Sequence, residues 1–163
     1  VVETLEALSA AIGSGRVGFR ICPGVSFNGM ADVAPAETYA TLLAATRHMG
    51  LAYVHLIDIP NQGFASFDLV RSNWDGPIIE NGGLTIEKAQ GIIAAGAAHA
   101  VSFGYPFIAN PDLVARFRTG TPLARADRDT FYTGFGDDRR GYTDYPLAAG
   151  SNDVNTREIG GIA

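Results

Sequence analysis

The chain has 163 residues, of which 47% are hydrophobic and 18% are charged, and its formal net charge is −5. This length and composition predict about one globular domain that can bury a sizeable core. The acidic balance argues against nucleic-acid binding, which requires a basic face, and no apolar run reaches the roughly 18 residues that predict a membrane span.

The first part of the chain predicts two helices that alternate with two strands. Apolar residues at helical spacing predict a helix over 1–12, and a short strand follows over 16–23. A helix at about 36–49 and a strand over 51–58 come next. The chain begins without methionine and inside the first helical pattern, so we expect a part of the protein upstream of it.

The remaining segments continue this alternation before the chain turns into an irregular tail. They are, in chain order, a helix over about 65–73, a strand over 76–83, a helix over 85–96 that Thr85 caps, a strand over 98–104, and a helix over 110–120 with Pro111 in its first turn. We therefore expect four strand-plus-helix units within 1–120 and a tail over 121–163.

Strands that alternate with helices predict a parallel sheet, because each crossover returns the chain to the same edge. The runs "AYVHLI" and "AHAVSF" are apolar on both faces, which is typical of parallel strands that helices cover. A doubly wound open sheet fits this pattern, and so does half of a (β/α)8 barrel, since a whole barrel needs about 200 residues or more.

Two of the predicted strands end in glycine, in "ENGG" at 80–83 and in "FGYP" at 103–106. Ligands of parallel α/β folds bind at the carboxyl ends of strands. A glycine there lets backbone N–H groups approach an anion, and a helix that follows adds partial positive charge. The alternative is that these glycines only end their strands, but their occurrence on consecutive units favours a phosphate site.

Arg20 lies within an apolar strand, where an arginine is costly to bury unless an anion pairs with it. Two interpretations stay open: a salt bridge to Asp58 or Glu80, or contact with a negatively charged cofactor or substrate. His55 also lies in mid-strand, and we favour a core histidine bonded to a neighbour over a catalytic base.

The cysteine and histidine content favours neither disulfides nor metal ligation. Cys22 is the single cysteine, so it cannot form an internal disulfide, and it is typical of a reducing cytoplasmic location. The three histidines, His48, His55 and His99, show no ligand spacing among themselves or with Cys22. We therefore expect no metal site.

Six blocks of the sequence resemble the C-terminal half of the old yellow enzyme family, in the family's order and up to about residue 148. They are "VGFRICPG…FNGM", "LAYVHLID", "IIENGG", "FGYPFIANPDL", "TFY" and "GYTDYP". The resemblance implies an FMN-dependent ene-reductase, a flavoprotein that reduces activated alkenes such as enones and nitroalkenes with NAD(P)H. It also implies a (β/α)8 TIM barrel in which this chain supplies strands five to eight.

The resemblance further implies that this half-barrel must be completed. The complement is either the family's N-terminal half, as a complementary half-barrel chain, or a second copy of this chain through self-association. The family's N-terminal half carries the His/Asn pair that binds the substrate carbonyl and the tyrosine that protonates the substrate, so no catalytic residue is assigned in this chain. The alternatives are a truncated, non-catalytic half-barrel that binds FMN or another phosphate ligand, and a self-paired structural dimer.

The resemblance also implies site residues. Arg20 resembles the arginine at the flavin pyrimidine edge, N1 and O2, where a cation stabilises the charge of the reduced flavin. The other cofactor-binding residues that it implies are Asn81, Gly82, Gly83, Phe103, Gly104 and Tyr105. Tyr142, in a tail that packs back on the barrel mouth, resembles the aromatic residue that lines the substrate cavity. Tyr105 stands where the family has arginine, which removes a charge-assisted phosphate contact.

Overall fold

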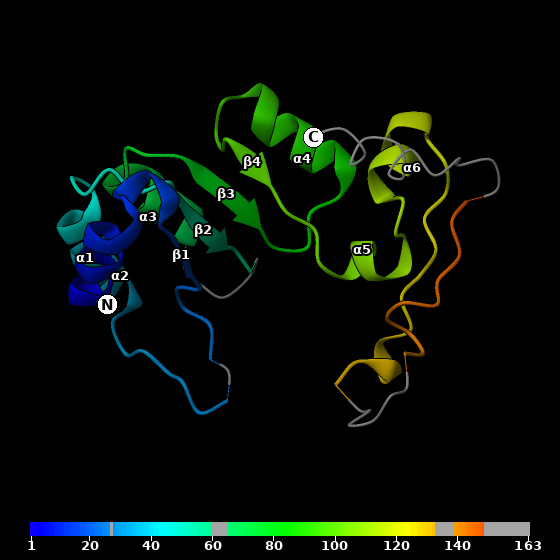
Figure 1. The fold of residues 1–163 in the computed structure, drawn as a ribbon, viewed down its shortest axis with the longest axis horizontal. Coiled ribbons are helices and arrows are strands. Elements are labelled where there is room, and N and C mark those ends of the chain that lie inside the picture. The colour runs from blue at the N-terminus through cyan, green and yellow to red at the C-terminus, as the bar shows by residue number, and fades with distance from the viewer. Residues whose placement is uncertain (27, 60–64, 133–138, 149–163) are drawn as a thin grey trace, which may run out of the picture. The chain divides into compact units, whose positions relative to one another are not determined.

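The computed structural model in Figure 1 describes residues 1–26, 28–59, 65–132 and 139–148. It forms two compact units, Val1–Ser102 and Phe103–Ala163. Phe27, from the first resembling block, and the end of the predicted tail, 149–163, lie outside the described residues. The division of the chain at residue 120 stays a prediction. No described helix is long and apolar enough to cross a membrane.

The first unit contains the alternation of helices and strands that the sequence predicts. Its elements are, in chain order, α1 (Val2–Ile12), the 3-10 turn η1 (Ser14–Arg16), β1 (Gly18–Ile21), α2 (Pro35–Thr46), β2 (Tyr53–Ile57), α3 (Ser66–Asn73), β3 (Ile78–Asn81), α4 (Ile86–Ala94) and β4 (Ala100–Val101). The helix predicted over about 65–73 is present as α3. Thr85 caps α4 as expected, because its hydroxyl accepts a hydrogen bond of 3.4 Å from the backbone N–H of Lys88.

The four strands form one parallel sheet in the order β1-β2-β3-β4. In its register Arg20 lies beside His55, His55 beside Ile79, and Ile79 beside Ala100. Every strand therefore pairs with its neighbour in the sequence. A doubly wound sheet reverses its strand order at a switch point, whereas a barrel wall does not. The observed order favours part of an α/β barrel, with β1 and β4 as the edges of the sheet.

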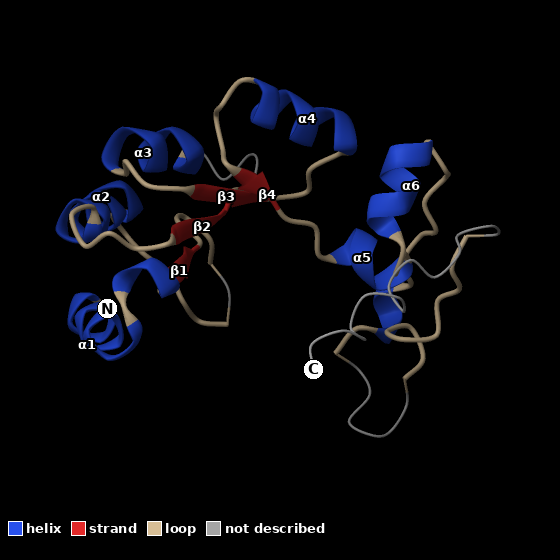
Figure 2. Ribbon diagram, turned by 45° about the horizontal axis from the view of Figure 1, so that its top comes forward, coloured by secondary structure: helices blue, strands red, loops and turns tan. Residues whose placement is uncertain are grey.

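Helices α2, α3 and α4 lie on the same side of these strands (Figure 2). On this helix-covered face, the strand residues Val54, Leu56 and Ile78 are buried against helix residues. Phe19 packs edge-on against the indole ring of Trp74, with ring centroids 5.9 Å apart. This face holds the core of the unit, and its burial supplies most of the driving force for folding.

The alternate residues of the strands point to the other face, which no helix covers among the described residues of the first unit. This helix-free face consists of Gly18, Arg20, Tyr53, His55, Ile57, Ile79, Asn81, Ala100 and Ser102. The sequence predicted strands that are apolar on both faces, which is typical of parallel strands covered by helices. In a barrel wall the second face lines the interior, so the apolar residues there need no helix to cover them.

The second unit begins with two short helices, α5 (Tyr105–Ala109) and α6 (Leu113–Thr119), and continues through the 3-10 turn η2 (Arg128–Thr130). The predicted helix over 110–120 is therefore wrong at its start, because α5 precedes it and Pro111 lies in the turn between the two helices. The buried Asn110 explains the break. Its side-chain amide donates to the carbonyls of Pro106 (2.8 Å) and Ala124 (3.0 Å) and accepts from the N–H of Ala124 (2.7 Å).

A buried ion pair holds the segments that follow α6. Arg116 Nε lies 2.7 Å from Asp112 Oδ1, and the guanidinium also donates to the carbonyls of Pro122 (2.9 Å) and Pro146 (3.3 Å). Asp112 accepts from the N–H of Ala148 (2.9 Å). The hydrogen bond from Arg116, followed by the one from Ala148, lowers the pKa of Asp112 to about 2. These bonds tie two described segments of the tail, at Pro122 and at Pro146 and Ala148, to α6 and its preceding residue Asp112.

Candidate functional site

Arg20 is an exposed cation in the middle of the edge strand β1, on the helix-free face. The two predicted partners for a structural salt bridge, Asp58 and Glu80, belong to the helix-covered face. Asp58 accepts a short hydrogen bond from the hydroxyl of Ser66 in α3, and Glu80 is buried. Neither ion pair between described residues includes Arg20. The structure thus gives no support to the salt-bridge interpretation and leaves the guanidinium available to a ligand.

A hydrogen-bonded group lies beside Arg20 on the same face. His55 Nε2 is 2.9 Å from the hydroxyl of Ser102, and the amide of Asn81 donates to the carbonyl and the hydroxyl of Ser102 (2.9 and 3.0 Å). Burial, and then the charge of Arg20, lower the pKa of His55, which favours the neutral form of its ring. His55 is thus bonded to a neighbour, as we favoured, although on the helix-free face.

Cys22 follows β1 and is a half-buried free thiol. Burial raises the pKa of this thiol, and the charge of Arg20 opposes that effect to a smaller extent. A thiol with a raised pKa is a weak nucleophile at neutral pH. Among its strand residues, the helix-free face therefore offers one permanent cation, Arg20, and the neutral hydrogen-bonding groups of His55 and Asn81. It has no carboxylate among these strand residues.

The two glycines after β3, Gly82 and Gly83, are glycines for different structural reasons. Gly82 has φ +150°, and a Cβ atom at this position would lie 1.6 Å from the carbonyl oxygen of Asp58. The fold itself therefore requires Gly82. Gly83 has φ +63°, in the left-handed region that favours glycine, but a Cβ there would meet no atom within 4 Å. Gly82 and Gly83 both line a pocket of the first unit, but of the two only Gly83 could carry a Cβ atom without a close contact.

Gly104, which directly precedes α5, differs from both. Its φ is −95°, which any residue can adopt, and no atom of its own unit lies within 4 Å of a Cβ built on it. Neither the backbone nor the packing of the second unit accounts for a glycine here. Its neighbours pack on aromatic rings: Phe103 lies 5.1 Å from Phe117, and Tyr105 is stacked on Phe131 at 5.3 Å.

Tyr142 belongs to the same aromatic cluster of the second unit. Its ring centroid lies 5.6 Å from that of Phe131, and its hydroxyl accepts a hydrogen bond from the N–H of Tyr132 (3.1 Å). Arg128 adds a cation, since its Cζ lies 4.6 Å from the ring centroid of Tyr105. Neither Phe131 nor Arg128 has a predicted role, although Phe131 belongs to the block "TFY" that resembles the family.

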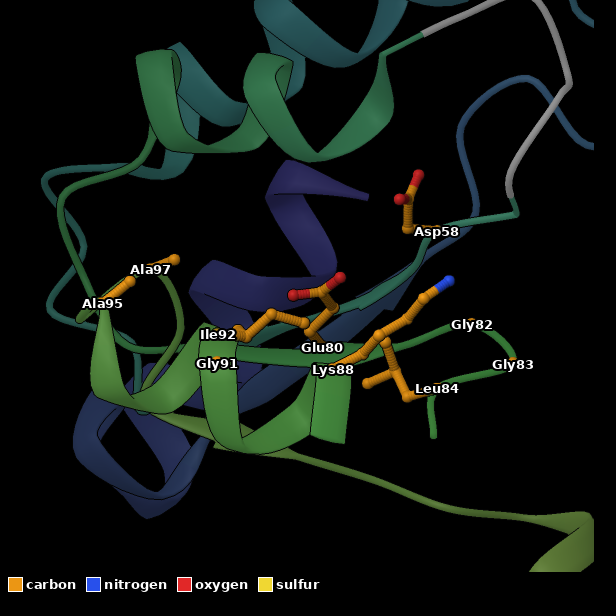
Figure 3. Close-up of a pocket in the computed structure, with 10 residues that line it drawn as sticks. All are labelled: Asp58, Glu80, Gly82, Gly83, Leu84, Lys88, Gly91, Ile92, Ala95 and Ala97. Atoms are coloured by element: carbon orange, nitrogen blue, oxygen red, sulfur yellow. The ribbon is translucent and has the colours of Figure 1, made fainter. Parts of the chain in front are cut away.

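A pocket of about 480 Å³ lies on the helix-covered side of the first unit, between the end of β3 and α4 (Figure 3). Its polar walls include Asp58, Glu80 and Lys88, and α4 contributes apolar wall at Ile92. Two carboxylates beside one lysine do not suit a phosphate. The pocket also lies on the side of the sheet opposite Arg20, so it is separate from the helix-free face.

Glu80 in this pocket is only 5% exposed, and its Oε2 has no hydrogen-bond partner among the described residues. Burial, and then the charge of Asp58, raise the pKa of Glu80. A carboxyl with a raised pKa in the folded state contributes stability that is fully present below its unfolded pKa and falls as pH rises through the folded value.

We expect Glu80→Gln to raise the melting temperature at about pH 8 and to make it less dependent on pH between about 4 and 8, because the neutral amide carries no desolvation penalty. Thermal unfolding followed by circular dichroism across this range checks the result. Glu87→Gln is the control, since backbone and Thr85 hydrogen bonds lower the pKa of Glu87. A lower melting temperature for Glu80→Gln at pH 8 would show that the carboxylate has a favourable partner.

Comparison with known proteins places the chain in a family. Residues 1–124 match the NADH:flavin oxidoreductase / NADH oxidase family. The chain is 36% identical over 154 residues to 12-oxophytodienoate reductase 1 of Oryza sativa subsp. japonica, with 90% of this chain and 40% of that protein covered. It is 38% identical over 157 residues to a putative NADPH dehydrogenase of Schizosaccharomyces pombe, with the same coverage.

Among solved structures, the old yellow enzyme of Trypanosoma cruzi is 36% identical and superposes with a TM-score of 0.81, covering 90% of this chain and 39% of that one. The chain belongs to the NADH:flavin oxidoreductase / NADH oxidase family, and the predicted old yellow enzyme relationship is confirmed. It spans about 40% of the length of the curated relatives it matches. The first unit is thus part of an α/β barrel from a family of flavin oxidoreductases that use NADH or NADPH.

Proposed function

We propose that this chain is the C-terminal half, strands five to eight, of a (β/α)8 barrel in an FMN-dependent ene-reductase. The enzyme reduces alkenes activated by a carbonyl or nitro group with NAD(P)H, and it is active only when the chain is joined to the N-terminal half. The observation that carries this proposal is Arg20, an exposed guanidinium without an ion pair among the described residues, on a face whose strand residues include no carboxylate.

The described residues fit FMN in two respects. The helix-free face offers the N–H donors of Arg20 to the electron-rich pyrimidine edge of a flavin, beside the neutral groups of Asn81 and His55. Gly104 borders open space in which phosphate oxygens can approach the backbone. When bound, FMN supplies the hydride chemistry, while the protein binds and orients the reactants. We assign charge stabilisation to Arg20 and contact with the substrate to Tyr142.

The edges of the sheet support the need for a second half. β1 and β4 each present one row of backbone N–H and C=O groups to no other strand of the sheet. Neither edge strand contains a lysine or a proline, which commonly protect an exposed edge. Closure of a barrel removes such edges. We therefore propose a complementary N-terminal half-barrel as the partner and, from the single free thiol, a cytoplasmic location.

The test uses the chain alone and the chain together with the N-terminal half-barrel, which we call the assembled protein. We expect the assembled protein to be yellow, to release FMN on denaturation and to reduce an enone with NADPH. We expect the chain alone to self-associate and to be inactive. Absorbance spectra, size-exclusion chromatography and turnover assays check this.

A denaturing gel and mass spectrometry of material from the native source show whether the His/Asn motif is present on the same or a second polypeptide. An assembled protein that stays colourless with added FMN would exclude the flavin site. A soluble monomer of the chain alone that reduces the enone would show that the missing half is not needed. A stable dimer of the chain that binds FMN without turnover would favour the non-catalytic alternative.

A further inference from the structure

We propose that Arg128 binds the phosphate group of the flavin nucleotide, with the stacked rings of Tyr105 and Phe131 holding its guanidinium next to the open space at Gly104. The inference rests on the proposed function, because FMN is the source of the phosphate. It assigns to η2 a binding residue that lies far in the sequence from the glycine turn it serves.

The position of the guanidinium is supported by two consecutive stacking contacts. The Cζ of Arg128 lies 4.6 Å from the ring centroid of Tyr105. The ring of Tyr105 in turn stacks on Phe131 with centroids 5.3 Å apart and planes inclined by 9°. Phe131 is only 6% exposed, so packing restrains the base of this stack. A guanidinium that rests on an aromatic face keeps its N–H edge free for hydrogen bonds.

The charge of Arg128 is available to a ligand. Its side chain is exposed, and the ion pairs between described residues, Arg47–Asp75 and Arg116–Asp112, do not include it. Asp127 precedes it in the chain, and the Oδ1 of Asp127 accepts a hydrogen bond from the N–H of Asp129 (3.1 Å) rather than from the guanidinium.

The ligand that fits this arrangement is an anion small enough to approach backbone. Tyr105 brings no charge of its own, and the glycine before it leaves open space that neither its φ of −95° nor its neighbours within the second unit explain. A planar guanidinium binds phosphate through two parallel N–H···O bonds. In FMN the phosphate is the one group that carries full negative charge at neutral pH, so Arg128 is directed to it.

The test compares FMN with riboflavin, which has the same ring system without the phosphate. In the assembled protein, stripped of flavin, we expect Arg128→Ala to weaken FMN binding by about tenfold or more, equal to about 1.4 kcal/mol, and to leave riboflavin binding unchanged. Arg128→Lys should lose less FMN affinity than Arg128→Ala, because lysine keeps the positive charge but lacks the planar guanidinium. Quenching of flavin fluorescence gives the dissociation constants.

Arg125→Ala is the matched control, since Arg125 is an exposed arginine of the same segment without a ring contact among those described. It should change neither affinity. Tyr105→Arg adds a second check. It should tighten FMN binding more in the Arg128→Ala background than in the wild type, where a cation is already present.

The outcomes separate the two proposals. If no flavin binds to the wild-type assembled protein, the proposed function fails and the role of Arg128 fails with it. If flavin binds but Arg128→Ala keeps the wild-type ratio of FMN to riboflavin affinity, the proposed function stands and the role of Arg128 is wrong. Equal losses of affinity for FMN and for riboflavin in Arg128→Ala would also overturn the phosphate-binding role of Arg128, because they indicate a structural role.

Discussion

Replacing Arg20 with alanine is expected to lower the two-electron reduction potential of FMN in the assembled protein by about 30–60 mV and to slow its reduction by NAD(P)H. The reduced flavin carries negative charge at its pyrimidine edge, and a hydrogen bond to a charged donor is worth about 1.5–3 kcal/mol. For a two-electron couple, about 30 mV corresponds to 1.4 kcal/mol. Spectroelectrochemistry measures the potential, and stopped-flow absorbance measures the rate.

Two further variants separate this role from a structural one. Arg20→Lys should recover part of the loss, since lysine keeps the charge but not the bidentate geometry. Arg16→Ala removes an exposed arginine in η1, outside the helix-free face, and should leave the potential unchanged. An unchanged potential in Arg20→Ala would mean that this guanidinium does not contact the flavin. Because Arg20 is exposed, we expect the melting temperature of Arg20→Ala to stay close to that of the wild type.

The second large effect is a contrast between two glycines for which the family resemblance implies the same role. Gly82→Ala is expected to destabilise the fold by at least about 3 kcal/mol, because its Cβ would lie 1.6 Å from the carbonyl oxygen of Asp58 and its φ is +150°. For a chain of this size, a loss of about 3 kcal/mol corresponds to a fall in melting temperature of about 6–12 °C.

Gly104→Ala should leave the melting temperature nearly unchanged and still weaken FMN binding, because its Cβ would occupy the open space beside the backbone. Thermal unfolding and FMN titration of both variants check the contrast. Unimpaired FMN binding by Gly104→Ala would show that the phosphate does not approach this turn. A Gly82→Ala variant of wild-type stability would show that the close contact with Asp58 relaxes easily.

Much of the secondary structure follows from local sequence. Apolar residues at helical spacing predicted α1, α2 and α4. The hydroxyl of Thr85, a common N-cap residue, predicted where α4 begins. The alternation of strands with helices predicted the parallel sheet. These features depend on neighbours within a few residues, so the order of residues along the chain is sufficient to predict them.

Local sequence misplaced the helices of the second unit for the opposite reason. Pro111 is a common first-turn residue, and it indicated a helix over 110–120. The break instead depends on Asn110, whose amide bonds to the backbone of Ala124 in a later segment. No local pattern reports that partner, because the two residues meet only after α6 has turned the chain back.

Some features of the candidate site were likewise predictable from the sequence, and others depend on the tertiary structure. From the sequence by itself came the arginine in an apolar strand, the glycines at two strand ends and the family that these blocks resemble. Strand alternation also separates Arg20 from its neighbours in the strand, but it does not say which face the helices cover. Packing of α2, α3 and α4 on one side buries Glu80 and leaves Arg20 exposed. Stacking between distant segments likewise brings Arg128 to Tyr105. Such contacts arise from burial and ring stacking across the fold, and so they became visible only in three dimensions.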